Sequence, residues 1–158
     1  MSGQLLSVAL ATALHALSAT VWVGGMFLIY VCLRPAHTVL PPPERIKLMA
    51  GVFQRFFIWV WIAIVLLLAS GYWIVFGAYA GFANAPLHIH IMQGTGLLMI
   101  LIFLHLYFAP WKRMHRAAEA EDWAEAAKNM GQMRRIVAAN LGLGLITAAI
   151  GASGRFWG

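Results

Sequence analysis

The sequence predicts an all-α integral membrane protein, a single four-helix transmembrane bundle that takes up residues 1–158. Apolar residues make up 62% of the chain and charged residues only 10%, whereas an ordinary soluble domain is about 25% charged. Four apolar runs approach the roughly 20 residues that a spanning helix needs. They cover residues 5–33, 56–76, 87–109 and 136–152. Because lipid offers the backbone no hydrogen bonds, each run is expected to be helical.

The first run is predicted to be a spanning helix rather than a cleaved signal peptide, because residues 1–14 contain no Lys or Arg and the apolar run exceeds a normal signal core. His15 lies inside this run. Trp22 falls on the same helical face, and Gly25 lies beside that face. Small residues let a second helix or a flat cofactor approach the backbone, so this face is expected to point into the bundle. Pro35 is expected to end the helix.

The other three runs have recognisable ends. Arg55 opens the second run, where its guanidinium reaches either lipid headgroups or a carboxylate such as a porphyrin propionate. Pro86 fits the first turn of the third run, and Pro110 is expected to end it. Residues 111–132 alternate charges with alanines, which predicts an amphipathic helix on the cytoplasmic surface between the third and fourth spans.

The net charge of +6 predicts the orientation in the membrane. Basic residues flank the first and third connections, whereas the second connection has none and Arg155 is the only base near the C-terminus. By the positive-inside rule, both termini lie outside and the basic connections lie in the cytoplasm of a bacterial-type inner membrane. This charge indicates contact with membrane lipid and gives no reason to expect nucleic acid as a partner.

Histidines inside apolar runs are the candidate functional residues, because ionisable groups are costly in hydrocarbon. His88 and His90 open the third run, and positions i and i+2 point to different sides of a helix. At about 1.5 Å per residue, His15 and His90 differ in depth by roughly one turn or less. Gly94 thins the helix beneath His90. His105 lies about 22 Å farther along the helix from His90 and is a poor partner.

Two imidazoles at one level suit a haem b between helices. Imidazole also binds copper or zinc, and histidines inside a bundle can simply bond neighbouring helices. On the residues alone these alternatives stay open. Cys32 is the only cysteine, so neither an intrachain disulfide nor a multi-cysteine metal site is expected.

The pattern His15-x6-Trp22-x-Gly24-Gly25 resembles the start of HemJ-type protoporphyrinogen oxidases and of the related CopD copper-resistance membrane proteins. The run from Leu87 to His90 is similar to the Leu-His-Ile-Lys motif that opens helix 3 in the HemJ family. The resemblance implies a b-type haem held by His15 and His90, with His88 as a near neighbour. Bis-imidazole ligation favours electron transfer over binding of substrate at iron.

The loops and the fourth run are more similar to the CopD side of this superfamily, which implies copper uptake or resistance. Met26, Met92 and Met99 lie among the histidines, and thioethers are ligands that Cu(I) prefers. None of these three methionines is part of a Met-x-x-Met cluster. Methionines are also ordinary packing residues in such helices.

The sequence therefore leads to one hypothesis with two alternatives. The hypothesis is a membrane b-type haem protein that relays electrons from a membrane or periplasmic donor to an acceptor such as quinone. Its metal ligands are His15 and His90, and its cofactor pocket also includes His88, Trp22, Gly25, Gly94 and Arg55. The alternatives are a CopD-type copper protein and a HemJ-like oxidase acting on a porphyrin precursor. Whether the chain is an enzyme or a homo-oligomer stays open, and no catalytic residue is assigned.

Overall fold

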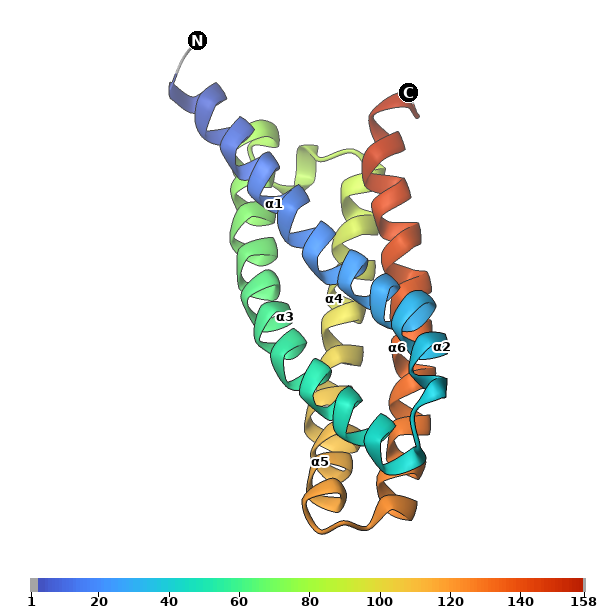
Figure 1. Cartoon of the computed structure of the whole chain (residues 1–158). Coiled ribbons are helices and arrows are strands. Elements are labelled where there is room, and N and C mark those ends of the chain that lie inside the picture. The colour runs from blue at the N-terminus through green and yellow to red at the C-terminus, as the bar shows by residue number, and fades with distance from the viewer. Residues whose placement is uncertain (1–2, 158) are drawn as a thin grey trace.

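The computed structural model describes residues 3–157, which form a bundle of long helices with no strand in that range (Figure 1). Four helices are long and apolar enough to cross a membrane, as the sequence predicts. Their regular α-helical parts are α1 (Gly3–Phe27), α3 (Pro42–Tyr79), α4 (Leu87–Leu106) and α6 (Trp123–Ser153). Two short helices, α2 (Arg34–Ala36) and α5 (Lys112–Glu119), extend α1 and α4.

Local backbone chemistry explains where α3 begins and ends. Pro41 is extended, and the prolines that follow it occupy the first turn of the helix, where a missing N–H costs nothing. At the other end, Ala80 is left-handed with φ 55° and Gly81 has φ 117°. The N–H of Gly81 donates to the Val75 carbonyl at 3.2 Å. These residues close the helix and turn the chain toward α4.

The structure corrects the predicted ends of the first and third spans. Pro35 lies inside α2 and does not end the first span, which continues to Val39. Pro110 does not stop the helix, because it lies in a π-helical turn, Tyr107–Trp111, which joins α4 to α5 without a break. The wider turn accommodates the proline ring and its missing donor. Residues 111–132 accordingly do not form a separate surface helix. They form α5 and the start of α6, joined by a tight turn in which the Asp122 side chain accepts from the N–H of Glu125 at 3.0 Å.

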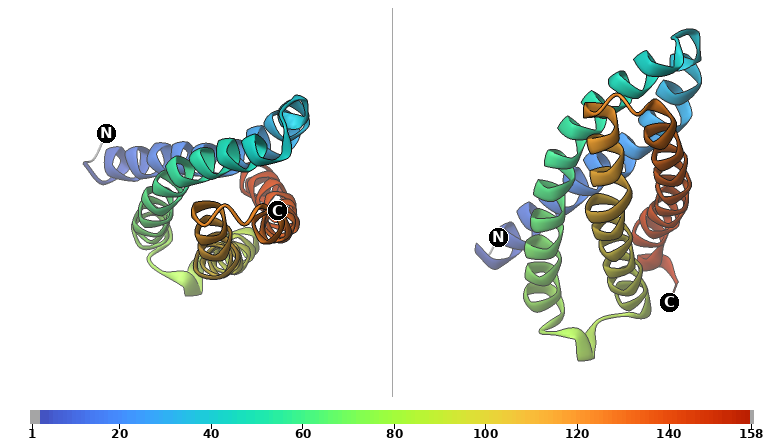
Figure 2. Two further views of the ribbon diagram at one scale, coloured as in Figure 1. Left: turned by 60° about the horizontal axis from the view of Figure 1, so that its bottom comes forward. Right: turned by 90° about the horizontal axis from the view of Figure 1, so that it is seen from below.

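The helices pack mainly in two pairs, α1 on α3 and α4 on α6. One end of the bundle holds both chain ends and the connection between α3 and α4 (Figure 1). The other end, here called the basic end, holds the α2–α3 and α5–α6 connections and thus the predicted cytoplasmic charges. Figure 2 shows from two further directions how α1 crosses the bundle toward α6 at the basic end. Which end faces the cytoplasm stays a prediction.

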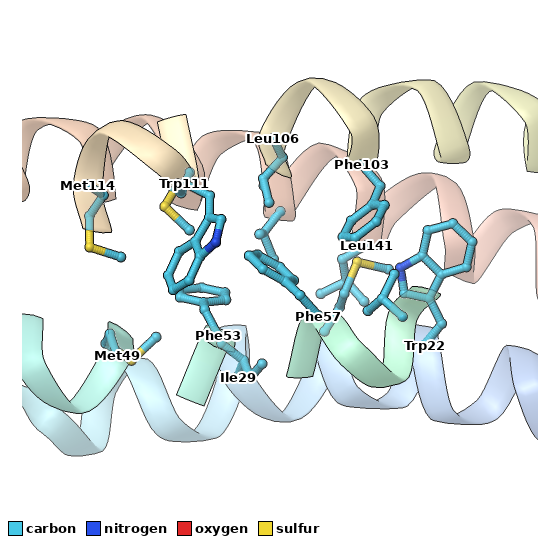
Figure 3. Packing of buried hydrophobic residues seen from close by; sticks show 14 of the residues in the cluster. Trp22, Ile29, Met49, Phe53, Phe57, Phe103, Leu106, Trp111, Met114 and Leu141 are labelled. Carbon is cyan, nitrogen blue, oxygen red and sulfur yellow. The ribbon is translucent and has the colours of Figure 1, made fainter. Parts of the chain in front are cut away.

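A row of aromatic rings fills the bundle from its middle to the basic end (Figure 3). Phe57 lies at its centre, with ring centroids 5.4 Å from Phe53, 5.5 Å from Phe103 and 5.2 Å from Trp111. Most of these pairs meet edge to face, the arrangement that ring quadrupoles favour. These rings join α3 to α4 and to the turn after it, on the side of the bundle toward the basic end.

The outer surface of the bundle is apolar. Only 17–28% of the most apolar window of each long helix is buried inside the molecule, and large side chains such as Leu10, Val65, Phe76 and Leu101 are exposed. An apolar surface of this extent needs a nonaqueous environment. The chain is therefore a multi-pass membrane protein.

Candidate functional site

His15 lies half-buried on α1 and contacts α3. Its Nδ1 is 3.0 Å from the Ser70 hydroxyl, and that hydroxyl donates its own hydrogen to the Leu66 carbonyl. The bond with Ser70 engages Nδ1 and leaves Nε2 of the ring without a partner from Ser70. A histidine oriented in this way presents the nitrogen that metals bind. Gly71 permits the contact, because a Cβ there would lie 3.2 Å from His15 Cε1.

His88 and His90 point to different sides of α4, as their spacing predicts. His88 is the inward one: it is 8% exposed, lies against Gly154 and packs edge to face with Trp157, with ring centroids 6.3 Å apart. His90, which the sequence analysis favours as a ligand, is exposed, with its ring 6.1 Å from that of Phe82. The structure thus gives the buried position to His88. A ligand role for His90 stays a prediction.

A line of soft and polar side chains on α4 faces small residues on α6 and the turn after it; we call this line the α4–α6 seam. The facing pairs, from the end with the termini inward, are His88 with Gly154, Met92 with Gly151, Thr95 with Thr147, and Met99 with Gly144. The two threonine hydroxyls are 2.9 Å apart. Glycines bring α6 close to α4 and leave room for the larger side chains. The seam therefore stacks one imidazole and two thioethers along the helix axis.

Gly154 tests the tightness of this seam. A Cβ there would overlap the Cβ and ring of His88, and the His88 Cβ is fixed by its own backbone. We expect Gly154→Ala to lower the free energy of unfolding by about 1–3 kcal/mol, as overpacked sites do. Gly142→Ala is the matched control, since a Cβ at Gly142 meets nothing within 4 Å. Thermal unfolding in detergent micelles compares the two variants, and equal stabilities would show that the seam is loose.

The remaining predicted cofactor residues do not gather around one site. Trp22 is buried against Phe103, with ring centroids 6.2 Å apart. Gly25 lies beneath the Phe56 ring, where it serves the packing of α1 on α3. Gly94 faces open space. Arg55 is exposed and donates to the Gly51 carbonyl of its own helix at 3.1 Å.

A small cavity in the middle of the bundle is bordered by a buried polar atom that has no hydrogen-bond partner. Asn140 on α6 is 3% exposed, and its Oδ1 is buried without a hydrogen-bond partner. It borders a cavity of about 20 Å³ whose wall also includes Trp22, Met26 and Phe57. Such a volume holds roughly one water molecule, and an unpaired buried acceptor is costly. A cation or a donor in this cavity would satisfy the oxygen.

Sequence reasoning missed this arrangement. The unpaired state of Asn140 depends on how α1, α3, α4 and α6 converge around it. The only signal in the sequence is that an amide stands seven residues from a seam position, Thr147, and so on the same face of α6.

The described residues offer imidazole and thioether donors rather than a cluster of the commonest metal ligands. No group of three or more His, Cys, Asp or Glu side chains within residues 3–157 is arranged to hold a metal ion. The described residues therefore hold none of the usual zinc clusters, but the absence of such clusters does not bear on sites built from methionine thioethers. The walls of the central cavity and of a second one at the basic end contain none of His15, His88 and His90. Neither of these two cavities therefore lies between the histidines.

Fold and site together define a helical membrane protein with imidazole and thioether donors along its interior. The family model described as copper resistance protein D, CopD, matches residues 50–153, which is 104 of the 158 residues. The chain belongs to the CopD family, and this confirms the resemblance drawn from its motifs. The match includes Asn140 and every residue of the α4–α6 seam except Gly154, and it begins after His15. No curated protein and no solved structure matches the chain.

Proposed function

We propose that this protein binds Cu(I) inside the bundle and carries it along the α4–α6 seam. The observation that supports this most is the seam itself, with its single row of donors from His88 through Met92 to Met99. Neutral imidazole and thioether are ligands that Cu(I) accepts. Membership of a family named for copper resistance favours the same metal.

The path would begin at His88 and end at the central cavity. His88 lies next to Trp157 near the end of the bundle, where an ion can enter from the aqueous side. Met92 and Met99 follow at four and eleven residues along one helical face. Met26 and the Asn140 Oδ1 meet at the central cavity beyond them. Copper moves by exchange between neutral ligands, so its charge and oxidation state do not change.

A Cu(I) titration tests the proposal. Purified protein is titrated under anaerobic conditions against a chromogenic chelator that competes for Cu(I). We expect Met92→Leu with Met99→Leu to weaken binding by at least roughly tenfold, since even indirect partners of metal ligands contribute this much. Met114→Leu with Met133→Leu is the control, because both methionines are fully buried outside the seam. Equal affinities for both double variants, or no binding by the unaltered protein, would contradict the proposal.

The electron-relay hypothesis requires a different cofactor and different ligands. It places a haem b between His15 and His90, with quinone as the acceptor, and it is favoured by the free Nε2 that Ser70 leaves on His15. It expects a Soret band that disappears in His15→Ala and His90→Ala. The copper proposal expects no such band and unchanged Cu(I) affinity in both variants. A HemJ-like oxidase would additionally rescue a cell that lacks protoporphyrinogen oxidase.

A further inference from the structure

A second cavity, of about 240 Å³, opens at the basic end of the bundle. It lies where the chain leaves the first span, turns through α2 and enters α3 beside α6, at the lower right of Figure 1. Its floor is apolar and includes Ile29, Ile46 and Phe53, all buried. None of the predicted site residues and none of the seam residues lines it. It shares only Val137 with the wall of the central cavity, so it is a neighbouring site that lies apart from the seam.

The wall of this cavity carries three guanidinium groups. Arg34, Arg45 and Arg134 line it, and no Asp or Glu does. Within residues 3–157 the only ion pairs join His115 to Glu119 and Lys128 to Glu125, so the three arginines lack a carboxylate partner. Arg45 is held in place because its Nε donates to the Leu40 carbonyl. Three unneutralised guanidiniums around one cavity attract an anion.

A histidine adds an independent sign of a missing partner. His37 also lines the cavity, and its Nδ1 is buried without a hydrogen-bond partner in the structure. Buried polar atoms are nearly always paired, so an unpaired one points to a ligand or water that supplies the bond. The oxygen of a phosphate or its ester accepts from imidazole and guanidinium alike.

The depth of the cavity identifies the kind of anion. Arg34 directly follows the first apolar run and Arg134 precedes the fourth, which places the charges at the level of lipid headgroups. We infer that the cavity binds the phosphodiester headgroup of an anionic phospholipid, with the guanidiniums on the phosphate and the acyl chains leading from the apolar floor into the membrane. A free phosphate would bind the arginines but would make no contact with the apolar floor of the cavity.

Lipid titration in detergent micelles tests this inference. The probes are phosphatidylglycerol, phosphatidylcholine with the same acyl chains, and inorganic phosphate. The readouts are the Tm and the number of lipids retained in native mass spectrometry. We expect phosphatidylglycerol to raise the Tm and to stay bound, and the other two to do neither. Equal shifts with phosphatidylcholine, or with inorganic phosphate, would overturn the inference.

Charge-matched variants separate the cavity from general charge attraction. Arg34→Gln with Arg134→Gln removes two of the lining guanidiniums. Arg116→Gln with Arg135→Gln removes the same charge from exposed positions outside the cavity. We expect the first pair to abolish the shift and the second to keep it, while both keep Cu(I) binding. Retention of phosphatidylglycerol by the first pair, or loss from both, would show that the cavity is not the site.

Discussion

Replacing Asn140 by leucine is expected to raise the free energy of unfolding by about 1–3 kcal/mol, the cost of a buried polar atom that lacks a partner. Asn140 is buried in the middle of the bundle with its Oδ1 unpaired. Leucine has a similar size and removes that atom. The same variant is expected to weaken Cu(I) binding, because the oxygen borders the central cavity. Reversible unfolding in mixed micelles and the chelator titration measure the two effects.

Asn129→Leu is the matched control for this prediction. Asn129 is equally buried, but its Oδ1 accepts from Arg113 at 3.0 Å and its amide donates to Glu125. Removing a satisfied amide leaves its partners unpaired, so this variant is expected to lose about 1–3 kcal/mol of stability. If the free energy of unfolding rises in Asn140→Leu and falls in Asn129→Leu, and Asn140→Leu also binds Cu(I) more weakly, then Asn140 serves binding at the cost of stability. Destabilisation by Asn140→Leu with unchanged copper affinity would mean that its role is structural.

Phe57→Ala is expected to cost about 3–5 kcal/mol of stability, the usual loss when a buried aromatic leaves a cavity. Phe57 is 3% exposed, and its ring packs against Phe103 of α4 and against Trp111 in the π-helical turn after α4. In a membrane these dispersion contacts carry more of the stability than the expulsion of water does.

Phe76→Ala serves as the control for Phe57→Ala, because Phe76 is 62% exposed on the same helix. We expect it to change the free energy of unfolding by less than about 1 kcal/mol, as surface substitutions do. Denaturant titration in mixed micelles gives both values. Similar losses for the two variants would show that the aromatic row is not the core of the bundle.

The fold was predictable because the length and apolar content of each run leave a membrane helix as the only way to satisfy the backbone. The exact ends of the helices were less predictable. Pro110 stays inside a helix because a π-helical turn makes room for it, and nothing in the local sequence pattern predicts that turn. Residues 111–132 look amphipathic because α5 and the start of α6 pack their alanines and methionines on each other and expose their charges.

The site was predictable only in part. The spacing of His88 and His90 requires that they diverge, but which one turns inward depends on Gly154, 66 residues farther along the chain. The pairing of His15 with Ser70 likewise depends on how α1 crosses α3. The unpaired atoms of Asn140 and His37 depend on several helices meeting at one place. Contacts of this kind are set by the tertiary packing.

X-ray absorption spectroscopy at the copper edge of Cu(I)-loaded protein tests the central claim most directly, because it identifies the atoms bound to the metal. The account predicts sulfur scatterers from the seam methionines together with a lighter nitrogen or oxygen neighbour, and a loss of sulfur in Met92→Leu with Met99→Leu. A coordination shell made only of nitrogen and oxygen, or a protein that takes up haem and no copper, would contradict it.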